Sequence, residues 1–354
     1  MNEFKLVALM RKLIRLIFVQ IRPASPRILF LEVTTRCNME CRHCDGDDVW
    51  GNSRGDLSLE MIRNLSTGLG FVESLAIGGG EAFLRDDIAE ICELFVQKNR
   101  VHNLSIHTNG FKPDAINNVV KRIMENCPGV TLNLMISLDG FITTHDSIRM
   151  PGSFDKAMQT ANFINKLKYD FNQLKLSFTA TVHSDNWQEL PALAKFINEK
   201  YKVKLECNIL SGKPRDSKLV LPPKIDLEMT LDRVYAENNN APIYNNFIEL
   251  YRNVRIKTQT EGRQVVPCIA GHLTCEIYAD GDVRACNHRS SFGNLNVISF
   301  QKIWNGVEAK RQHKSIRSGG CTCDDINIMR PSLSNYWKLP LLLLQQRLQS
   351  KPTS

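Results

Sequence analysis

The chain has no long stretch without charge. Among its 354 residues, no run of about 18 is free of charged side chains, which is the length that a membrane-spanning helix needs. Arg15 interrupts the apolar stretch near the amino terminus, and no small-residue cleavage site follows it. These absences argue against a transmembrane helix and a cleavable secretion signal, so we expect a cytoplasmic protein.

The cysteines do not form a convincing disulfide framework. There are eleven of them, an odd number, spread over a long chain. Three lie close together at Cys37, Cys41 and Cys44, a spacing that favours metal ligation in a reducing compartment. Three others, Cys92, Cys127 and Cys207, lie in helix or strand patterns and are predicted to be buried apolar residues.

Positive charge is concentrated at the two ends. Of the net +8, residues 1–27 carry +5 and the residues from Arg311 onward carry another +5, so the centre is slightly acidic. The basic residues are not interleaved with aromatic ones, and no RNA-binding motif is visible, so we expect no nucleic acid partner. Basic ends of this kind favour contact with an acidic surface.

Residues 4–22 have the pattern of an amphipathic helix. At about 100° per residue, the basic side chains fall within a sector of roughly 120°, opposite the leucines and isoleucines. This pattern is typical of a helix lying in a membrane interface, and it predicts a peripheral position on the inner face of the membrane. The alternative is a helix that packs on the protein's own barrel.

Strand and helix patterns alternate through the first two thirds of the chain. The strands are predicted at residues 28–33, 72–77, 103–107, 131–137, 174–182 and 203–210, and the helices at 58–69, 86–99, 113–126, 153–168 and 185–200. Such alternation indicates right-handed βαβ units and a parallel sheet. The predicted fold class is α/β, a partial (β/α)6 TIM-like barrel with ligands at the carboxyl ends of the strands.

The pattern changes after residue 210. A Pro-, Gly- and Lys-containing connection leads to two predicted helices, at residues 226–237 and 244–258, and a small cysteine-rich carboxyl-terminal extension follows. The predicted divisions are a basic amphipathic helix (1–27), a barrel core (28–212), a helical connection (213–262), a cysteine-bearing domain (263–330) and an apolar, basic tail (331–354).

The segment Cys37-Asn-Met-Glu-Cys41-Arg-His-Cys44 follows the first predicted strand directly. Three thiolates this close on one loop can face one cluster, and thiolate is the usual ligand of iron–sulfur centres. Three ligands for four irons leave one iron open for chemistry. A zinc site is the alternative reading, but zinc favours C-x₂-C pairs with two further ligands, and no fourth ligand is obvious.

This C-x₃-C-x₂-C spacing resembles the signature of the radical S-adenosylmethionine (SAM) superfamily, and the resemblance covers most of the chain. It implies a [4Fe–4S] cluster on Cys37, Cys41 and Cys44 whose open iron chelates SAM. It also implies a reductant protein such as ferredoxin or flavodoxin. One electron passed to the sulfonium then releases a 5′-deoxyadenosyl radical, which abstracts hydrogen from a substrate.

Two further motifs extend the resemblance. Gly79, Gly80 and Glu81 end the second strand and are similar to the family's G-G-E motif, which implies that they contact SAM. A tight turn would explain the glycines but not the glutamate.

The block from Ser137 to Arg149 resembles the S-x-D-G…H-D-x-x-R stretch of relatives with a cysteine-rich extension. This implies that Ser137 contacts the SAM ribose region and that Arg149 binds the SAM carboxylate, for which a guanidinium is well suited. Asn109, after the third strand, either lines the site or belongs to a plain turn.

The second set of cysteines resembles a SPASM or twitch extension. Cys268 and Cys286 flank a predicted hairpin at Asp280-Gly281, and the chain has Cys321-Thr-Cys323 where the family usually has C-x₂-C. The resemblance implies one auxiliary iron–sulfur cluster on Cys268, Cys286, Cys321 and Cys323. Cys275 is an alternative fourth ligand, and a zinc site is the alternative to a cluster.

Three functional classes follow from these features. The first is a radical SAM enzyme that acts on a sugar, a polyol or a lipid-linked small molecule, with a net oxidation as the expected reaction. The second is a maturase of a ribosomally made peptide, although only 36 residues precede Cys37, too few for a separate peptide-recognition domain. The third is a non-catalytic iron–sulfur or zinc protein.

Overall fold

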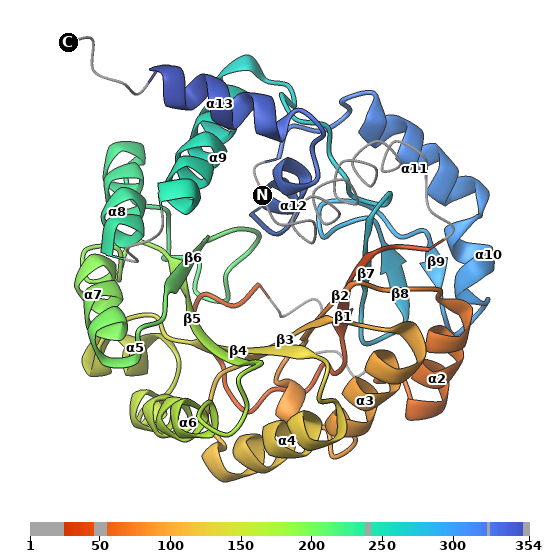
Figure 1. The fold of residues 1–354 in the computed structure, drawn as a ribbon, viewed down its shortest axis with the longest axis horizontal. Helices are drawn as coiled ribbons and strands as arrows, with labels where there is room; N and C mark the ends of the chain where they lie inside the picture. The colour runs from red at the N-terminus through yellow and green to blue at the C-terminus, as the bar shows by residue number, and fades with distance from the viewer. Residues whose placement is uncertain (1–24, 46–54, 238–241, 324–325, 350–354) are drawn as a thin grey trace, which may run out of the picture.

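The structure is a computed structural model, which describes residues 25–45, 55–237, 242–323 and 326–349. The predicted amphipathic helix at residues 4–22 lies outside these ranges. A curved nine-stranded sheet has the order β6-β5-β4-β3-β2-β1-β7-β8-β9, and helices line its outer side (Figure 1). The strands are β1 (Ile28–Glu32), β2 (Ser74–Gly78), β3 (Asn103–Thr108), β4 (Thr131–Ser137), β5 (Leu174–Val182), β6 (Leu205–Ile209), β7 (Thr274–Ile277), β8 (Asp282–Arg284) and β9 (Gly293–Asn294).

Helices connect the parallel strands and continue beyond them. They are α2 (Leu59–Gly68), η1 (Ala82–Leu84), α3 (Ile88–Asn99), α4 (Pro113–Asn126), α5 (Ile142–Ile148), α6 (Ser153–Leu167), α7 (Leu190–Tyr201), α8 (Lys224–Glu237), α9 (Pro242–Glu261), α10 (Phe300–Trp304), α11 (Val307–Arg317), α12 (Ile326–Ser334) and α13 (Leu339–Gln349). The α/β fold class is confirmed, and the first six strands match the predicted ones within two residues. The short helix α5 was not predicted.

The two faces of the strands differ in polarity. Leu75, Ile106 and Leu134 are fully buried on the side that packs against the helices. Alternate positions such as Glu32, His107 and Ser137 are only partly buried. Because side chains alternate across a strand, the interior of the barrel is polar and the hydrophobic core lies between sheet and helices.

The carboxyl-terminal hairpin is part of the main sheet. β7 pairs in parallel with β1, from Ile28 opposite Thr274 to Leu31 opposite Ile277, and β8 pairs antiparallel with β7. The predicted hairpin is therefore confirmed. The cysteine-bearing region shares one sheet and one hydrophobic core with the barrel.

The last residues are helical and packed, where the sequence predicted a tail. α12, α13 and α9 enclose a second apolar cluster built around Leu250, Tyr251, Val254 and Leu333. Among the described residues, no helix combines the length and the hydrophobicity that crossing a membrane would need.

Candidate active site

The loop after β1 carries the three clustered cysteines. Cys37 is exposed, Cys44 is half-buried and Cys41 is buried. The three thiols are close enough to influence one another electrostatically. Partial desolvation by the surrounding protein raises the pKa of Cys37 even though its side chain reaches solvent. Burial raises the pKa of Cys41, and it raises that of Cys44 to about 11. A positively charged group is therefore needed nearby to hold them as thiolates.

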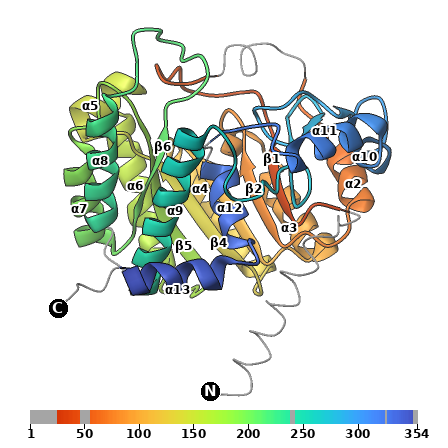
Figure 2. The same cartoon turned by 90° about the horizontal axis from the view of Figure 1, so that it is seen from above.

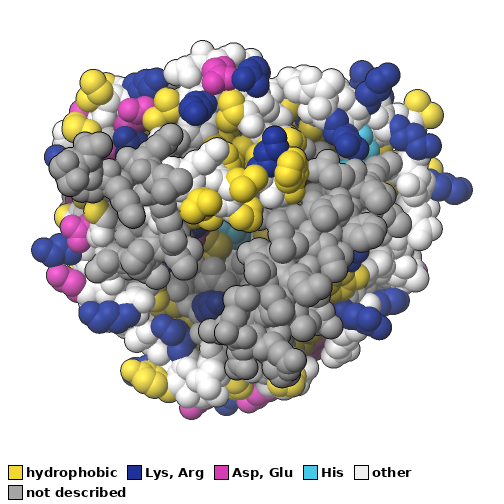
Figure 3. Space-filling model, turned by 45° about the horizontal axis from the view of Figure 1, so that its top comes forward, with side chains coloured by type: hydrophobic (Ala, Val, Ile, Leu, Met, Phe, Trp, Pro, Cys, Tyr) yellow, Lys and Arg dark blue, Asp and Glu magenta, His cyan; other side chains and the backbone are white. Residues whose placement is uncertain are grey.

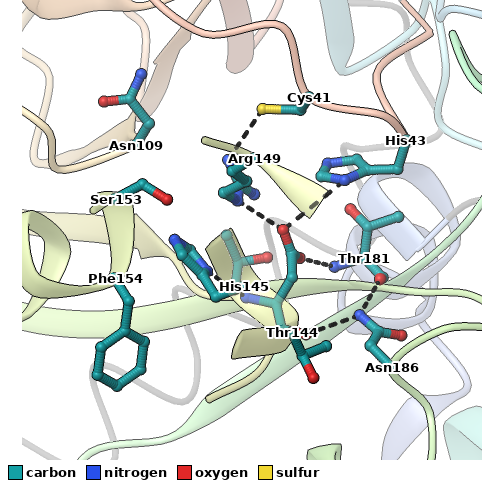
Figure 4. A network of polar contacts seen from close by, with 12 residues as sticks. Cys41, His43, Asn109, Thr144, His145, Arg149, Ser153, Phe154, Thr181 and Asn186 are labelled. Atoms are coloured by element: carbon teal, nitrogen blue, oxygen red, sulfur yellow. Dashed lines mark hydrogen bonds and ion pairs between the residues drawn. The ribbon is translucent and has the colours of Figure 1, made fainter. Parts of the chain in front are cut away.

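Arg149 supplies a positive charge beside these thiols. Its Nη1 lies 3.8 Å from the Sγ of Cys41, and its Nε donates a 2.6 Å hydrogen bond to Asp139 Oδ2 (Figure 4). The Asp139 side chain is fully buried, and that of Arg149 is only 8% exposed. Burial alone would raise the pKa of Asp139, but Arg149, His43 and His145 outweigh it and lower that pKa, so Asp139 is ionised.

Asp139 is also held in place by its neighbours. Its other carboxylate oxygen accepts a 2.8 Å hydrogen bond from the backbone N–H of Thr181, and its carbonyl accepts one from Asn186 (Figure 4). Its own N–H donates to Nδ1 of His145. In the structure the Arg149 guanidinium pairs with Asp139, and the predicted binding of the SAM carboxylate by Arg149 stays a prediction.

Gly79 and Gly80 are needed for close backbone packing. A Cβ at Gly79 would lie 2.5 Å from the carbonyl oxygen of Thr34, and one at Gly80 would lie 2.2 Å from that of Arg36. Gly79 also has a φ of +128°, which favours glycine. The two glycines let the turn after β2 lie directly against the cysteine loop.

Glu81, which follows β2, is buried and hydrogen-bonds to residues at the end of β3. It is 3% exposed, and its carboxylate accepts hydrogen bonds of 2.8 Å from Thr108 Oγ1 and 2.8 Å from the N–H of Asn109. Burial raises its pKa, although these hydrogen bonds oppose the shift. Asn109 in turn donates a 2.8 Å hydrogen bond to Asn38 on the cysteine loop. Ser137 ends β4 opposite Thr179 of β5.

Three histidines surround this network, the buried His145 and His183 and the mostly buried His43, and the sequence reasoning gave none of them a role. His43 and His183 stack with ring centroids 6.0 Å apart, and His145 faces Phe154 (Figure 4). Burial lowers the pKa of His43 and His145 to about 4, so both rings are neutral at pH 7. The position of His43 between Cys41 and Cys44 was the available signal.

A segment far along the chain holds the cysteine loop in place. Residues 212–219, which we call the strap, donate backbone hydrogen bonds from Arg215 to the carbonyl of Cys44 and from Asp216 to that of Arg42. The Arg42 guanidinium pairs with Asp216 at 2.8 Å and with Asp185 at 3.0 Å. The sequence reasoning treated this segment only as a connection.

Three of the four predicted auxiliary cysteines converge. The Cys268 thiol donates a hydrogen bond to Cys321, and this bond is the largest cause of the lowered pKa of Cys321. A second hydrogen bond from Cys323 and a contact with Arg289 lower that pKa further. Gln264 Nε2 also lies 3.3 Å from Cys321 Sγ. Cys286 is buried two residues after β8.

The remaining cysteines are core residues. Cys275 is fully buried on β7, and its role as an alternative fourth ligand stays a prediction. Cys92, Cys127 and Cys207 are at most 2% exposed, so the prediction of their burial is confirmed. In the described part of the chain, no three His, Cys, Asp or Glu side chains are close enough to hold a single metal ion.

A cavity of about 670 Å³ lies between the two groups of cysteines. His43 and Cys44 line it on one side, and His288 and Cys323 line it on another. Thr181, Asn208, Tyr235, Arg255 and the leucines of α8 are among its other lining residues. This volume is in the range of sites that enclose a small molecule or a few residues of a chain.

Comparison with known proteins agrees with this geometry. Residues 31–197 match the Radical SAM superfamily, and residues 268–325 match SPASM, an iron–sulfur cluster-binding domain. The chain belongs to the radical SAM superfamily and carries a SPASM domain.

Among its relatives is the AdoMet-dependent heme synthase of Methanosarcina barkeri, 24% identical over 81% of this chain and 84% of the relative. Another is the mycofactocin maturase MftC of Mycolicibacterium smegmatis, 26% identical over 84% and 74%. The crystal structure of Streptococcus suis SuiB bound to precursor peptide SuiA has the same fold, with a TM-score of 0.58 and 15% identity over 89% and 72% of the two chains.

The protein is therefore a radical SAM enzyme whose cofactors are a [4Fe–4S] cluster with SAM and auxiliary iron–sulfur clusters. The residues present fit these groups. Each group of thiols has N–H donors aimed at a sulfur, from Arg149 to Cys41 and from Gln264 to Cys321. Such donors stabilise thiolate sulfur in iron–sulfur sites. His43, whose Nδ1 lies 3.8 Å from Asp139 Oδ2, belongs to the lining of the cavity.

Proposed function

We propose that this radical SAM enzyme carries out a net two-electron oxidation of a peptide substrate inserted into the cavity between its two groups of cysteines. The observation that carries the proposal is the cavity itself, because Cys44 lines one side and Cys323 another. A substrate held there would be within reach of both cluster sites.

Two observations favour a peptide. The rim near the start of α8 exposes apolar side chains outside the cavity, with Val220 56% and Ile225 71% exposed, so a chain longer than the cavity would find further contacts there. The similar fold of SuiB was solved with a precursor peptide, and MftC is named a maturase. The sequence had favoured a sugar, polyol or lipid-linked molecule, for which the relatives above offer no support.

The proposed roles follow the predicted sites. Cys37, Cys41 and Cys44 would hold the catalytic cluster, and Cys268, Cys286, Cys321 and Cys323 the auxiliary one. Gly79, Gly80, Glu81, Asn109 and Ser137 would contact SAM, and Arg149 would bind the SAM carboxylate. Arg149 would stabilise the Cys41 thiolate while Asp139 orients it.

When bound, SAM on its reduced cluster supplies a 5′-deoxyadenosyl radical and the auxiliary cluster supplies a one-electron acceptor. The substrate gives up one hydrogen atom, one electron and one proton, so the product is lighter by two hydrogens. Cavity residues such as Thr181, Asn208 and Arg255 would orient the substrate and exclude water. The electron donor would be a ferredoxin or flavodoxin.

The first test concerns the catalytic cysteines. The anaerobically reconstituted protein should convert SAM into 5′-deoxyadenosine and methionine under dithionite. A Cys37→Ala, Cys41→Ala, Cys44→Ala variant should lose this activity and about four irons per chain. Turnover in the triple variant would contradict the assignment of these three cysteines as ligands of the catalytic cluster.

The second test concerns the substrate. Short peptides encoded beside the gene should be incubated with the reconstituted enzyme, SAM and reduced flavodoxin, and then analysed by mass spectrometry. A loss of two hydrogens that depends on SAM supports the proposal. If no peptide is altered while a sugar or polyol is, the peptide assignment is wrong and the oxidation of a small molecule takes its place.

A further inference from the structure

Helix α13 has two apolar faces, and within the described ranges of the chain only one of them packs against protein. Leu339, Leu342 and Leu343 pack against the apolar cluster that includes Leu250 and Val254 of α9. This contact holds α13 flat against the molecule.

The other face is apolar and open to solvent. Trp337 just before the helix is 46% exposed, and Leu341 and Leu344 are each 55% exposed. Their spacing of four and three residues places them on one side of a helix. Figure 3 shows hydrophobic side chains gathered beside a Lys or Arg on this side of the molecule. We call Trp337, Lys338, Leu341 and Leu344 the α13 face.

The sequence of this part of the chain is basic. Lys338 Nζ lies 4.9 Å from the centre of the Trp337 ring. In the sequence, residues 326–354 contain four basic residues, Arg330, Lys338, Arg347 and Lys351, and no aspartate or glutamate. Lys338 belongs to the α13 face, whereas Arg330 pairs with Glu206 of β6. Leucines, a tryptophan and basic residues without acidic ones form the composition of helices that lie in the interface of an anionic bilayer.

We infer that the α13 face docks this enzyme onto an anionic lipid bilayer, with the helix lying parallel to the membrane plane. The eleven residues of α13 are too few to cross a bilayer, which needs about 20. Three exposed apolar side chains are also too few for a stable protein interface, which buries about 800 Å² on each partner. A flat basic and apolar stripe fits the surface of a lipid bilayer better than it fits a membrane-spanning position or a protein interface.

The docked orientation separates the membrane from the cavity mouth. Figure 2 shows α13 along one end of the molecule and the segment leading into α8 at the opposite end. Leu221 and Lys224 of that segment line the cavity and are exposed. A bilayer under α13 would therefore leave this opening facing water, so the substrate would enter from the aqueous side.

The test is co-sedimentation of the full-length protein with vesicles. Wild type should bind phosphatidylglycerol vesicles more tightly than phosphatidylcholine vesicles. Leu341→Glu with Leu344→Glu should weaken binding to the anionic vesicles at least about tenfold, because two leucines leave the membrane and two like charges approach it. The matched control is Val307→Glu on α11, where an 85% exposed valine lies outside this face, and it should bind as wild type does.

Fluorescence separates this contact from any other anchor on the chain. Brominated lipids in anionic vesicles should quench wild-type tryptophan emission more than that of Trp337→Phe, because Trp337 would lie among the lipids. Equal quenching in the two proteins, or unchanged sedimentation of the double variant, would overturn the inference. If light scattering shows that the double variant breaks up a dimer and vesicle binding is unchanged, the α13 face binds a second copy and not a membrane.

Discussion

At the scale of single residues, the buried pair of Asp139 and Arg149 connects the barrel to the cysteine loop. The two side chains meet at 2.6 Å, and the same guanidinium approaches Cys41. A buried charge without its partner is costly, whereas the loss of both charges costs less.

We therefore expect Arg149→Met to lower the free energy of unfolding by about 3 kcal/mol, since it leaves Asp139 unpaired. The double variant Asp139→Asn, Arg149→Met should be clearly more stable than the sum of the two single changes predicts. Thermal denaturation of the four proteins measures this. Additive losses would show that the pair is not coupled.

Gly80 gives a second prediction at this scale. Gly80→Ala should displace the cysteine loop, because its Cβ would lie 2.2 Å from the carbonyl oxygen of Arg36. Because the displaced loop carries the cluster cysteines, the iron content after reconstitution should fall. Gly129→Ala is the matched control, since a Cβ there meets nothing within 4 Å. Full iron content in Gly80→Ala would contradict the expectation.

The carboxyl group of Glu32 predicts that the free energy of unfolding depends on pH. It lies on the interior side of β1, and burial raises its pKa from 4.5 to about 7. Between these values the folded state binds more protons than the unfolded state, so stability falls as the pH rises from about 4.5 to 7 and is level above. Glu32→Gln removes this loss.

The free energy of unfolding of Glu32→Gln should therefore exceed that of wild type by a margin that grows from about pH 4.5 to pH 7 and is level above, reaching about 3 kcal/mol. Glu199→Gln, at an exposed position of α7, should show no such trend. A margin independent of pH would contradict the assignment.

At the scale of elements, residues 4–22 and α13 each have a predicted membrane-binding face, but the two faces are recognised in different ways. The first pattern is visible in the sequence alone, and its position is outside the described residues. The second emerges only when one face of α13 is covered by α9.

We expect the segment at residues 4–22 to bind anionic vesicles by its basic side chains. Replacing Lys5, Arg11, Lys12 and Arg15 by Gln should reduce binding, and added salt should weaken wild-type binding by screening. Co-sedimentation over a range of salt concentrations measures both effects. Equal binding to neutral vesicles, or none at all, would speak against this role.

At the scale of the whole molecule, two cysteine sites share one cavity. If the auxiliary site serves oxidation of the substrate, Cys268→Ser with Cys286→Ser should still form 5′-deoxyadenosine but should stop product formation. Wild type should make about one product for each 5′-deoxyadenosine. Many products per SAM consumed, or full product from the double variant, would exclude a net oxidation that uses this site.

The sequence by itself determined the order of the first six strands and of most helices between them, because their hydrophobic periods of 2 and 3.6 residues are local properties. It also identified the cysteine loop, since Cys37, Cys41 and Cys44 lie within eight residues. The radical SAM and SPASM assignments followed from short motifs of this kind, and both are confirmed.

The tertiary structure alone decided how distant segments meet. The pairing of β7 with β1 joins residues about 250 apart, and no local pattern encodes such a contact. The same holds for the strap that binds the cysteine loop, for the cavity that Cys44 and Cys323 share, and for the partner of Arg149. Spacing along a chain tells which side chains are available, but only packing brings a charge, a thiol or an apolar face to its neighbour.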